Sequence, residues 1–332
     1  MLLVDSLYVN YGGALSLLRY LVERLQERNV AFFLLADARC KGIFEKVPFV
    51  EYREAKLSER RSFYLDHKDD FSSVFCFGNV PSPVKLNVPI YVYFHNINML
   101  TLANCRDWKQ KVMFWLKRTY ISLYRKNTDK WFVQTSNTAN SLEHSLGISK
   151  ERIKLFPFYK LPPFENDVSV RTDYIFVGEY SGSKGHDELL EAWKLLHQRG
   201  IDLALHLTVS LGGKFKEELE KAVSNGVKII NHGYVSMEEL SKLYMQSKAT
   251  VYPSYDESFG LGLVEAMEAG CDVVASNRDF VYAICKPSEV FDPQSPESIA
   301  GAIIRYESGK CQRTIQVVHN KIDEMIDEIC NE

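Results

Sequence analysis

The sequence predicts an α/β protein with parallel sheets, divided into two domains. Short apolar runs typical of buried strands alternate with amphipathic runs typical of helices along most of the chain. The 332 residues exceed the content of one ordinary hydrophobic core. Residues 159–170, with Pro162, Pro163 and Asn166, interrupt the alternation and have the composition of a linker. We therefore place the domain boundary in this segment.

The composition describes a soluble globular protein, with 46% hydrophobic and 25% charged residues. The net charge of −3 gives no general reason to bind nucleic acid. The first residues lack the basic start and long apolar stretch of a signal peptide. No later segment has the roughly 20 apolar residues that cross a bilayer. We expect a cytoplasmic protein.

No metal site is predicted. The seven cysteines are scattered without a C-x-x-C pair, the eight histidines are equally dispersed, and no D-x-D triplet occurs. The cysteines are expected to be reduced thiols that mostly fill the core.

The first half of the chain alternates strands and helices. Strands are expected at residues 1–9, 31–37, 72–77, 89–94, 129–135 and 151–158, and helices at 14–28 and 136–146. This order favours a parallel sheet covered on both faces. Gly12 and Gly13 form a turn between the first strand and its helix, where the backbone either approaches a ligand closely or makes an ordinary loop.

His95 and Asn96 follow the strand expected at residues 89–94. Folds of this kind bind ligands at the carboxyl ends of parallel strands, which makes His95 a candidate ligand contact. A lone histidine is also often a structural residue. Hydrogen bonding to a ligand is favoured over a role as general base.

Residues 106–126 are basic and aromatic. They carry seven Lys or Arg against one Asp, with Trp108, Phe114, Trp115 and Tyr120 interleaved. Such a helix either lies on an anionic membrane surface or packs its aromatic side chains on the sheet and leaves its charges in water. No nucleic-acid recognition motif accompanies the charge.

The second half begins a new alternation. Strands are expected at residues 174–177, 203–210, 227–231 and 249–252, and helices at 187–199, 236–246, 261–269, from 296, and at 320–330. Ser236 and Glu239 have the spacing of a capping box. Lys184 lies in a glycine-flanked loop between strand and helix, where a cation can neutralise a diphosphate or remain an exposed solubilising charge.

Residues 251–276, VYPSYDESFGLGLVEAMEAGCDVVAS, combine strand, loop, helix and strand signals most densely. The free N–H groups of a first helical turn, here near Phe259, Gly260 and Leu261, suit a phosphate. Carboxylates such as Glu257 and Glu265 accept strong hydrogen bonds from sugar hydroxyls. A nucleotide sugar fits this combination, and the alternative is that both glutamates are solvated charges.

The segment ESFGLGLVE resembles the E-x7-E motif of family 4 retaining glycosyltransferases of the GT-B fold, and EAMEAGCDVVAS continues the pattern. The resemblance covers most of the second half and, more weakly, the first. It implies two Rossmann-like domains that face a cleft. It also implies that Glu257 contacts the donor sugar and that Glu265 contacts the nucleotide ribose.

Further roles follow from the same resemblance. The family places a glycine-rich loop at Gly12 and Gly13 facing the donor phosphates, and a histidine at His95 near the donor sugar. Lys184 would neutralise the leaving diphosphate. Tyr234 and Val235 would lie beside the nucleotide base, although plain packing is the favoured explanation for each of them singly.

Two residues depart from the family pattern. Glu179 stands where the family usually has an arginine, so half of the expected cationic clamp is missing. Ser210 stands where the family typically has a glycine after the strand. Either another basic residue substitutes, or backbone amides hold more of the phosphates.

The expected domains are residues 1–160, a linker at 161–170, a nucleotide-sugar-binding domain at 171–310, and a terminal helix at 311–332 that crosses back to the first domain. The resemblance implies a metal-independent, retaining transfer from a nucleotide-diphosphate sugar to a glycan, such as a lipid-linked oligosaccharide of O-antigen or capsule synthesis. No further cofactor is expected.

Three alternatives remain open. A catalytically silent subunit of a membrane glycan assembly complex would bind nucleotide without turnover. A nucleotide-sugar epimerase or hydrolase of the same fold would need no acceptor. A dinucleotide oxidoreductase would need a G-x-G-x-x-G turn, which the chain lacks.

Overall fold

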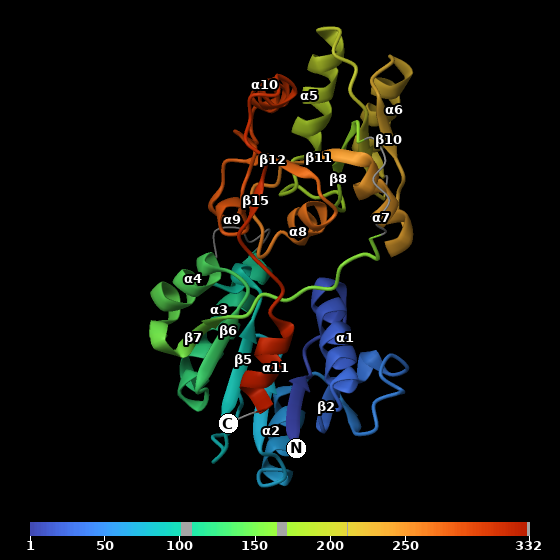
Figure 1. The fold of residues 1–332 in the computed structure, drawn as a ribbon. Helices are drawn as coiled ribbons and strands as arrows, with labels where there is room; N and C mark the ends of the chain where they lie inside the picture. The colour runs from blue at the N-terminus through green and yellow to red at the C-terminus, as the bar shows by residue number, and fades with distance from the viewer. Residues whose placement is uncertain (101–107, 165–170, 211, 331–332) are drawn as a thin grey trace. The chain divides into compact units, whose positions relative to one another are not determined.

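The structure, a computed structural model, describes residues 1–100, 108–164, 171–210 and 212–330 (Figure 1). The chain forms two compact units: unit 1 is Met1–Lys160 together with His319–Glu332, and unit 2 is Leu161–Val318. Arg106 and Asp107 of the basic segment, Leu211, and residues 165–170 of the expected linker lie outside the described residues.

Unit 1 contains a seven-stranded parallel sheet in the order β3-β2-β1-β4-β5-β6-β7. The strands are β1 (Leu2–Ser6), β2 (Phe32–Asp37), β3 (Val50–Arg53), β4 (Ser73–Cys76), β5 (Ile90–Phe94), β6 (Lys130–Val133) and β7 (Ile153–Leu155). The order reverses between β1 and β4, and ligands of open parallel sheets bind at such a switch point.

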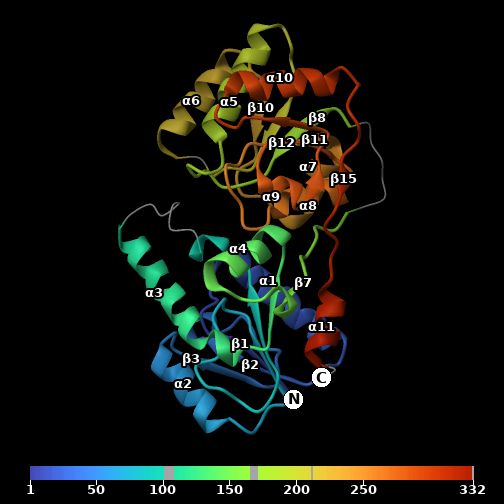
Figure 2. The same ribbon diagram turned by 90° about the vertical axis from the view of Figure 1, so that its left-hand side faces the viewer.

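The helices of unit 1 are α1 (Gly12–Glu27), α2 (Leu57–Asp66), α3 (Trp108–Tyr124), α4 (Ser136–Leu146) and α11 (Ile322–Cys330). Short 3-10 turns occupy Ala38–Cys40, Ile97–Met99, Arg125–Asn127 and Lys150–Arg152. In both ribbon views α11, in red, lies with the blue and green elements of this unit (Figures 1 and 2).

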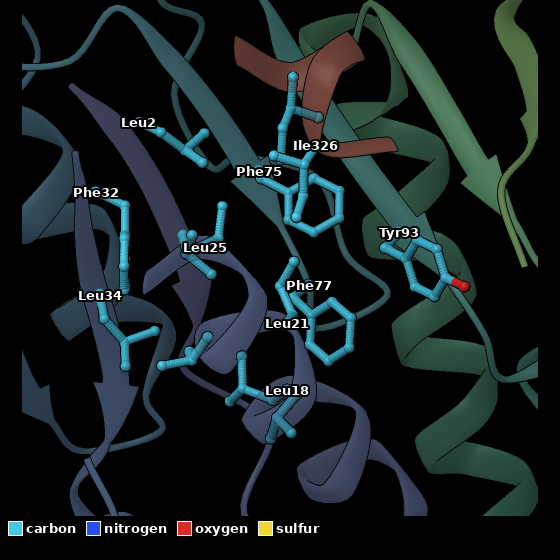
Figure 3. Close-up of a cluster of buried hydrophobic side chains, with 14 of the residues drawn as sticks. Leu2, Leu18, Leu21, Leu25, Phe32, Leu34, Phe75, Phe77, Tyr93 and Ile326 are labelled. Carbon is cyan, nitrogen blue, oxygen red and sulfur yellow. The ribbon is translucent and has the colours of Figure 1, made fainter. Parts of the chain in front are cut away.

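The core of unit 1 is split by its sheet. On one face Leu18, Leu21 and Leu25 of α1 point toward Phe75, Phe77 and Ile326, as Figure 3 shows. The other face buries side chains of α2, α3 and α4, among them Phe63, Phe114 and Leu142. Helix α11 is held further because the hydroxyl of Ser73 donates to the carbonyl of Ile329 at 2.9 Å.

Unit 2 contains a six-stranded sheet in the order β10-β9-β8-β11-β12-β14, and all its pairings are parallel. The strands are β8 (Asp173–Phe176), β9 (Leu205–Leu207), β10 (Ile229–Asn231), β11 (Ser247–Tyr252), β12 (Asp272–Ser276) and β14 (Glu289–Phe291). The short strands β13 (Cys285–Lys286) and β15 (Ile315–Gln316) pair antiparallel. Because of this pair, unit 2 continues to Val318.

The helices of unit 2 are α5 (His186–Gln198), α6 (Gly213–Ser224), α7 (Met237–Gln246), α8 (Leu261–Glu268), α9 (Asp279–Tyr282) and α10 (Pro296–Glu307). Helices α5 and α10 lie side by side (Figures 1 and 2). The expected capping box is present, since the Ser236 hydroxyl accepts from the N–H of Glu239 and the Glu239 carboxylate accepts from the N–H of Ser236.

Several features differ from the sequence expectations, and three of them bear on the architecture. Strand β3 was not predicted, because this half-buried edge strand reads VEYR and carries no apolar run. Helix α6 was also not predicted, although Phe215, Leu219 and Ala222 are buried on one face at helical spacing. Gly12 and Gly13 belong to the first turn of α1 rather than to a turn before it.

Candidate functional site

The loops that carry Lys184 and Glu257 are brought together by the sheet of unit 2. Strands β8 and β11 are parallel neighbours, so the loops at their carboxyl ends lie side by side. The N–H of Tyr255 donates to the carbonyl of Ser183 at 2.8 Å. Gly185 has φ +66°, and a Cβ there would lie 2.5 Å from the carbonyl oxygen of Pro253. Only glycine allows this close approach of the two loops.

Lys184 and Glu257 form an ion pair between these loops. The hydroxyl of Tyr252 donates to the same oxygen of Glu257 at 3.1 Å. The ammonium of Lys184 also lies 5.7 Å from the centre of the Tyr252 ring. Burial, followed by the neighbouring Glu257 carboxylate, raises the pKa of Tyr252 well above its usual value. The sequence placed Lys184 and Glu257 in one site but gave no reason to expect that they touch.

Helix α8 begins beside this ion pair. Gly260 is its N-cap with φ +78°, and no side chain caps the helix. The first N–H groups of a helix have no acceptor within the helix, so this end suits an anion. Phe259 is largely buried, and Leu261 is the first helical residue. The predicted phosphate-binding position therefore lies at a helix start whose backbone donors are not capped by a side chain.

Glu265 points into the protein from the middle of α8. Its residue exposure is 6%, and it accepts a hydrogen bond from the hydroxyl of Tyr244 at 3.0 Å. Burial disfavours the charged carboxylate and raises its pKa to about 7, while the bond from Tyr244 offsets part of this shift. Gly262 keeps the helix close to β11, since a Cβ there would lie 3.2 Å from the ring of Tyr252. A carboxyl with such a pKa changes charge near neutral pH.

Tyr252 and Tyr244 were not predicted as site residues. Tyr252 ends β11 and Tyr244 lies in α7, and each contacts one of the two glutamates of the motif. The sequence carries a weak signal for Tyr252 only, because it stands at the carboxyl end of a strand that leads into the motif.

Tyr234 and Val235 differ in their surroundings. Tyr234 is 89% exposed, whereas Val235 is partly buried against the cluster that contains Ile175, Leu240 and Tyr244. No contact joins either of them to Glu257 or Lys184 in the part of unit 2 that the structure describes. Their placement beside a nucleotide base stays a prediction.

The two residues that depart from the family pattern contact each other. Glu179, in the loop after β8, is hydrogen-bonded to Ser210, in the loop after β9. Glu179 therefore holds the neighbouring loop. This position offers no cation to a ligand, as the arginine of the family pattern would.

Gly12, Gly13 and His95 lie in unit 1. Gly12 has φ +63°, and a Cβ at either glycine would meet nothing within 4 Å. His95 follows β5, its ring contacts Asn79, and burial lowers its pKa to about 4. His95 is therefore uncharged at neutral pH, and its role toward a ligand stays a prediction.

Neither a metal cluster nor a membrane span is found in the described ranges. Across residues 1–100, 108–164, 171–210 and 212–330, no three His, Cys, Asp or Glu side chains converge in a way suited to a metal ion. Over those same residues, every helix is too short or too polar to cross a bilayer.

The segment that carries this site is similar to known proteins. Residues 164–320 match the family model described as glycosyl transferases group 1. An uncharacterized 41.2 kDa protein in the cps region of Klebsiella pneumoniae is 28% identical over 188 residues, which cover 53% of this chain and 49% of that protein. The O-antigen chain mannosyltransferase B of Escherichia coli is 30% identical over 138 residues, or 40% of this chain and 35% of that protein. The chain thus spans about half the length of these curated relatives, or less.

A solved structure extends the likeness to both units. The lipopolysaccharide outer core galactosyltransferase WaaB, in its apo form, superposes with a TM-score of 0.66 and covers 99% of this chain and 94% of its own. The sequence identity is 16%, so the likeness concerns the fold alone.

Two parallel α/β units with this likeness define a protein of the GT-B fold, as the sequence predicted. Its residues 164–320 match the family model of group 1 glycosyl transferases, and the resemblance to GT-B glycosyltransferases seen in the E-x7-E motif is confirmed.

Proposed function

We propose that this chain transfers a sugar from a nucleotide-diphosphate sugar to a glycan acceptor, with retention of configuration and without a metal ion. The observation that carries the proposal is the Lys184–Glu257 pair beside the uncapped start of α8. It combines a cation and backbone donors for the diphosphate with a carboxylate for the sugar hydroxyls.

In this reaction the bond between the anomeric carbon and the diphosphate oxygen breaks, and its electron pair leaves with the diphosphate. The acceptor hydroxyl oxygen forms the new bond on the same face, and its proton passes to the departing diphosphate. Lys184 shares its charge between Glu257 and the diphosphate, and so stabilises the negative charge that develops. Glu257 remains available to accept hydrogen bonds from the sugar.

Glu265 would accept hydrogen bonds from the nucleotide ribose. Two carboxylates near a diphosphate repel it, and the burial of Glu265 reduces this repulsion because its charged form is disfavoured. Arg278 precedes α9 at the carboxyl end of β12. It would supply the positive charge toward the diphosphate that Glu179, in place of the family's arginine, does not supply. Its neighbour Tyr255 lies in the loop that carries Glu257.

The acceptor we propose is a lipid-linked oligosaccharide of O-antigen or capsule synthesis. This rests on the names of the similar proteins, which include an O-antigen mannosyltransferase and a protein of a cps region. We also propose that α3 attaches the protein to the inner face of the cytoplasmic membrane. Phe114 and Ile121 of α3 are buried, whereas Trp108 and Trp115 are exposed.

The first test is calorimetric titration with UDP, GDP, dTDP, CDP and ADP. We expect one diphosphate to bind, and binding to weaken at least tenfold in Lys184→Ala and in Glu265→Ala. Lys194→Ala is the matched control, because Lys194 pairs with Glu191 on the surface of α5. Binding that is unchanged in both site variants would exclude the proposed site.

Turnover distinguishes the alternatives. Release of diphosphate that depends on an added glycan acceptor, and that persists in EDTA, supports the metal-independent transferase. Release without any acceptor indicates a hydrolase, and a changed sugar without release indicates an epimerase. Nucleotide binding without turnover favours a silent subunit of an assembly complex.

A further inference from the structure

Tyr252 places a buried hydroxyl at the carboxyl end of β11. The residue is 2% exposed, and its ring lies edge-on to the ring of Phe176, with the two ring centres 5.3 Å apart. Helix α8 packs closely on the same ring, since a Cβ at Gly262 would lie 3.2 Å from it. A buried tyrosine hydroxyl needs a hydrogen-bond partner, because an unpaired polar group is unfavourable away from water.

The partner of this hydroxyl is the Oε1 atom of Glu257, at 3.1 Å. The ammonium of Lys184 is paired with the same oxygen. An ionised carboxylate only accepts hydrogen bonds, so both groups are donors to it. Oε1 of Glu257 therefore has two donors within the protein, and they come from two different segments.

The second oxygen of Glu257 has different surroundings. In the part of unit 2 that the structure describes, no protein group donates a hydrogen bond to Oε2. The side chain of Glu257 is 16% exposed, so most of it is shielded from solvent. The two donors on Oε1 thus hold the carboxylate and leave Oε2 to accept from a ligand.

The two donors differ in their freedom to move. Lys184 has a long flexible stem, and its side chain is 24% exposed. The side chain of Tyr252 has only two rotatable bonds, and its ring is enclosed by Phe176 and α8. In the proposed reaction Lys184 shares its charge with the diphosphate, so its bond to Glu257 weakens when the ligand binds. The tyrosine hydroxyl cannot follow the ligand and stays on Oε1.

We propose that Tyr252 is a positioning residue that keeps Glu257 in place when Lys184 turns toward the diphosphate. This inference rests on the proposed function, since the diphosphate comes from it. Tyr252 acts through Glu257 and itself contacts no substrate. Without its hydroxyl, the carboxylate loses both donors to Oε1 in the bound state.

The variant Tyr252→Phe isolates this role. It removes the hydroxyl and keeps the ring, so the packing on Phe176 and the contact with the Lys184 ammonium, 5.7 Å from the ring centre, remain. Tyr306→Phe is the matched control. The hydroxyl of Tyr306 donates to a carboxylate oxygen of Asp272 at 3.0 Å, at the amino end of β12 and so at the opposite edge of the sheet from the site.

The bond itself is tested without a ligand, by ¹³C NMR of the full chain labelled at Cζ of its tyrosines, with the Tyr252 signal assigned from Tyr252→Phe. We expect this signal to shift in Glu257→Ala, where the acceptor is lost. It should shift much less in Lys184→Ala, where the hydroxyl still holds Glu257. An unchanged signal in Glu257→Ala, or an equal shift in both variants, overturns the inference. The Tyr306 signal should be the same in all these proteins.

Binding tests the role toward the diphosphate. UDP, GDP, dTDP, CDP and ADP are the probes, and the one that the natural chain accepts should bind about tenfold more weakly to Tyr252→Phe, as expected for one lost hydrogen bond. The reason is that a bound diphosphate then draws Lys184 away from a carboxylate that has no other donor. Tyr306→Phe should change binding by less than about twofold. Equal binding to Tyr252→Phe and to the natural chain contradicts the inference.

The Glu257→Ala background separates positioning from a general structural role. In that background Tyr252→Phe should weaken binding by less than about a further twofold, because no carboxylate is left to hold. A further tenfold loss there would show that Tyr252 acts through packing, and would overturn the inference. If none of the five diphosphates binds the natural chain, the proposed function fails and the role of Tyr252 toward the ligand fails with it. The NMR comparison still decides whether Tyr252 and Glu257 are bonded.

Discussion

The carboxylate of Glu179 accepts two hydrogen bonds from Ser210, one from its backbone N–H at 3.2 Å and one from its hydroxyl at 2.9 Å. These residues are the two departures from the family pattern at this edge of the sheet, and they form a single contact. Strands β8 and β9 are parallel neighbours, so the loops that follow them meet. Glu179 therefore has a structural partner that an arginine would not have.

Glu179→Arg should restore a cation in the loop that carries Lys184. We expect the accepted nucleoside diphosphate to bind about tenfold tighter at low salt, because a negative charge near the phosphates is replaced by a positive one. Calorimetry at two ionic strengths measures this. Glu217→Arg makes the same charge change on the exposed surface of α6 and should have little effect. Weaker binding in Glu179→Arg would mean that the bond to Ser210 matters more than the charge.

Glu265 should make the stability of the chain depend on pH. Its pKa is raised to about 7 by burial, so the folded protein binds its proton more tightly than the unfolded chain does. The stabilisation from this proton is complete below the unfolded value near 4.5 and is lost as the pH rises to about 7.

Relative to Glu265→Gln, the natural chain should therefore lose about 3 kcal/mol of unfolding free energy between pH 5 and pH 8. Urea unfolding of both proteins at several pH values gives this difference. Glu268→Gln, at the end of the same helix, is the control. A difference that does not vary with pH would show that Glu265 is ionised throughout.

Local signals explain why parts of the site could be predicted from the sequence. The Ser236–Glu239 capping box depends on neighbouring residues only, and it has the expected form. The E-x7-E motif likewise specifies a loop and a helix in one continuous segment. Such features can be predicted without knowing the order of the strands in the sheet.

Contacts between distant segments could not be predicted. Lys184 forms an ion pair with Glu257 because β8 and β11 are adjacent. The local sequence pattern does not specify which strands are adjacent. The Tyr244–Glu265 bond depends in the same way on how α7 packs. Asn79 lies in a loop with no motif, and its contact with His95 follows from the pairing of β4 with β5.

Arg60 should be essential for the stability of unit 1. Its Nε donates to Asp5 at 2.7 Å, and its Nη1 donates to the carbonyl of Pro81 at 2.7 Å. Arg60 and Asp5 are both almost fully buried, so Arg60→Met leaves a buried carboxylate without its cation, with the hydroxyl of Tyr64 and the N–H of Leu7 as its remaining donors. We expect a loss of about 3–5 kcal/mol in unfolding free energy. Arg61→Met, on the exposed side of α2, should change it by less than about 0.5 kcal/mol.

The exposed face of α3 should bind anionic membranes. Trp108 and Trp115 are 69% and 56% exposed, and Leu116 and Leu123 are exposed as well. Lys109 and Lys111 lie on the same helix and supply positive charge. Apolar side chains enter the headgroup region while nearby cations are attracted to anionic lipids.

The change that tests this surface is the double variant Trp108→Ser with Trp115→Ser. We expect it to bind vesicles containing phosphatidylglycerol at least tenfold more weakly than the natural chain in a sedimentation assay, because two large apolar side chains no longer enter the lipid. High salt should also weaken binding of the natural chain, since it screens the basic residues. Tyr282→Ser removes an exposed aromatic side chain from unit 2 and should leave binding unchanged. Equal binding of the natural chain and the double variant would exclude Trp108 and Trp115 as the membrane contact.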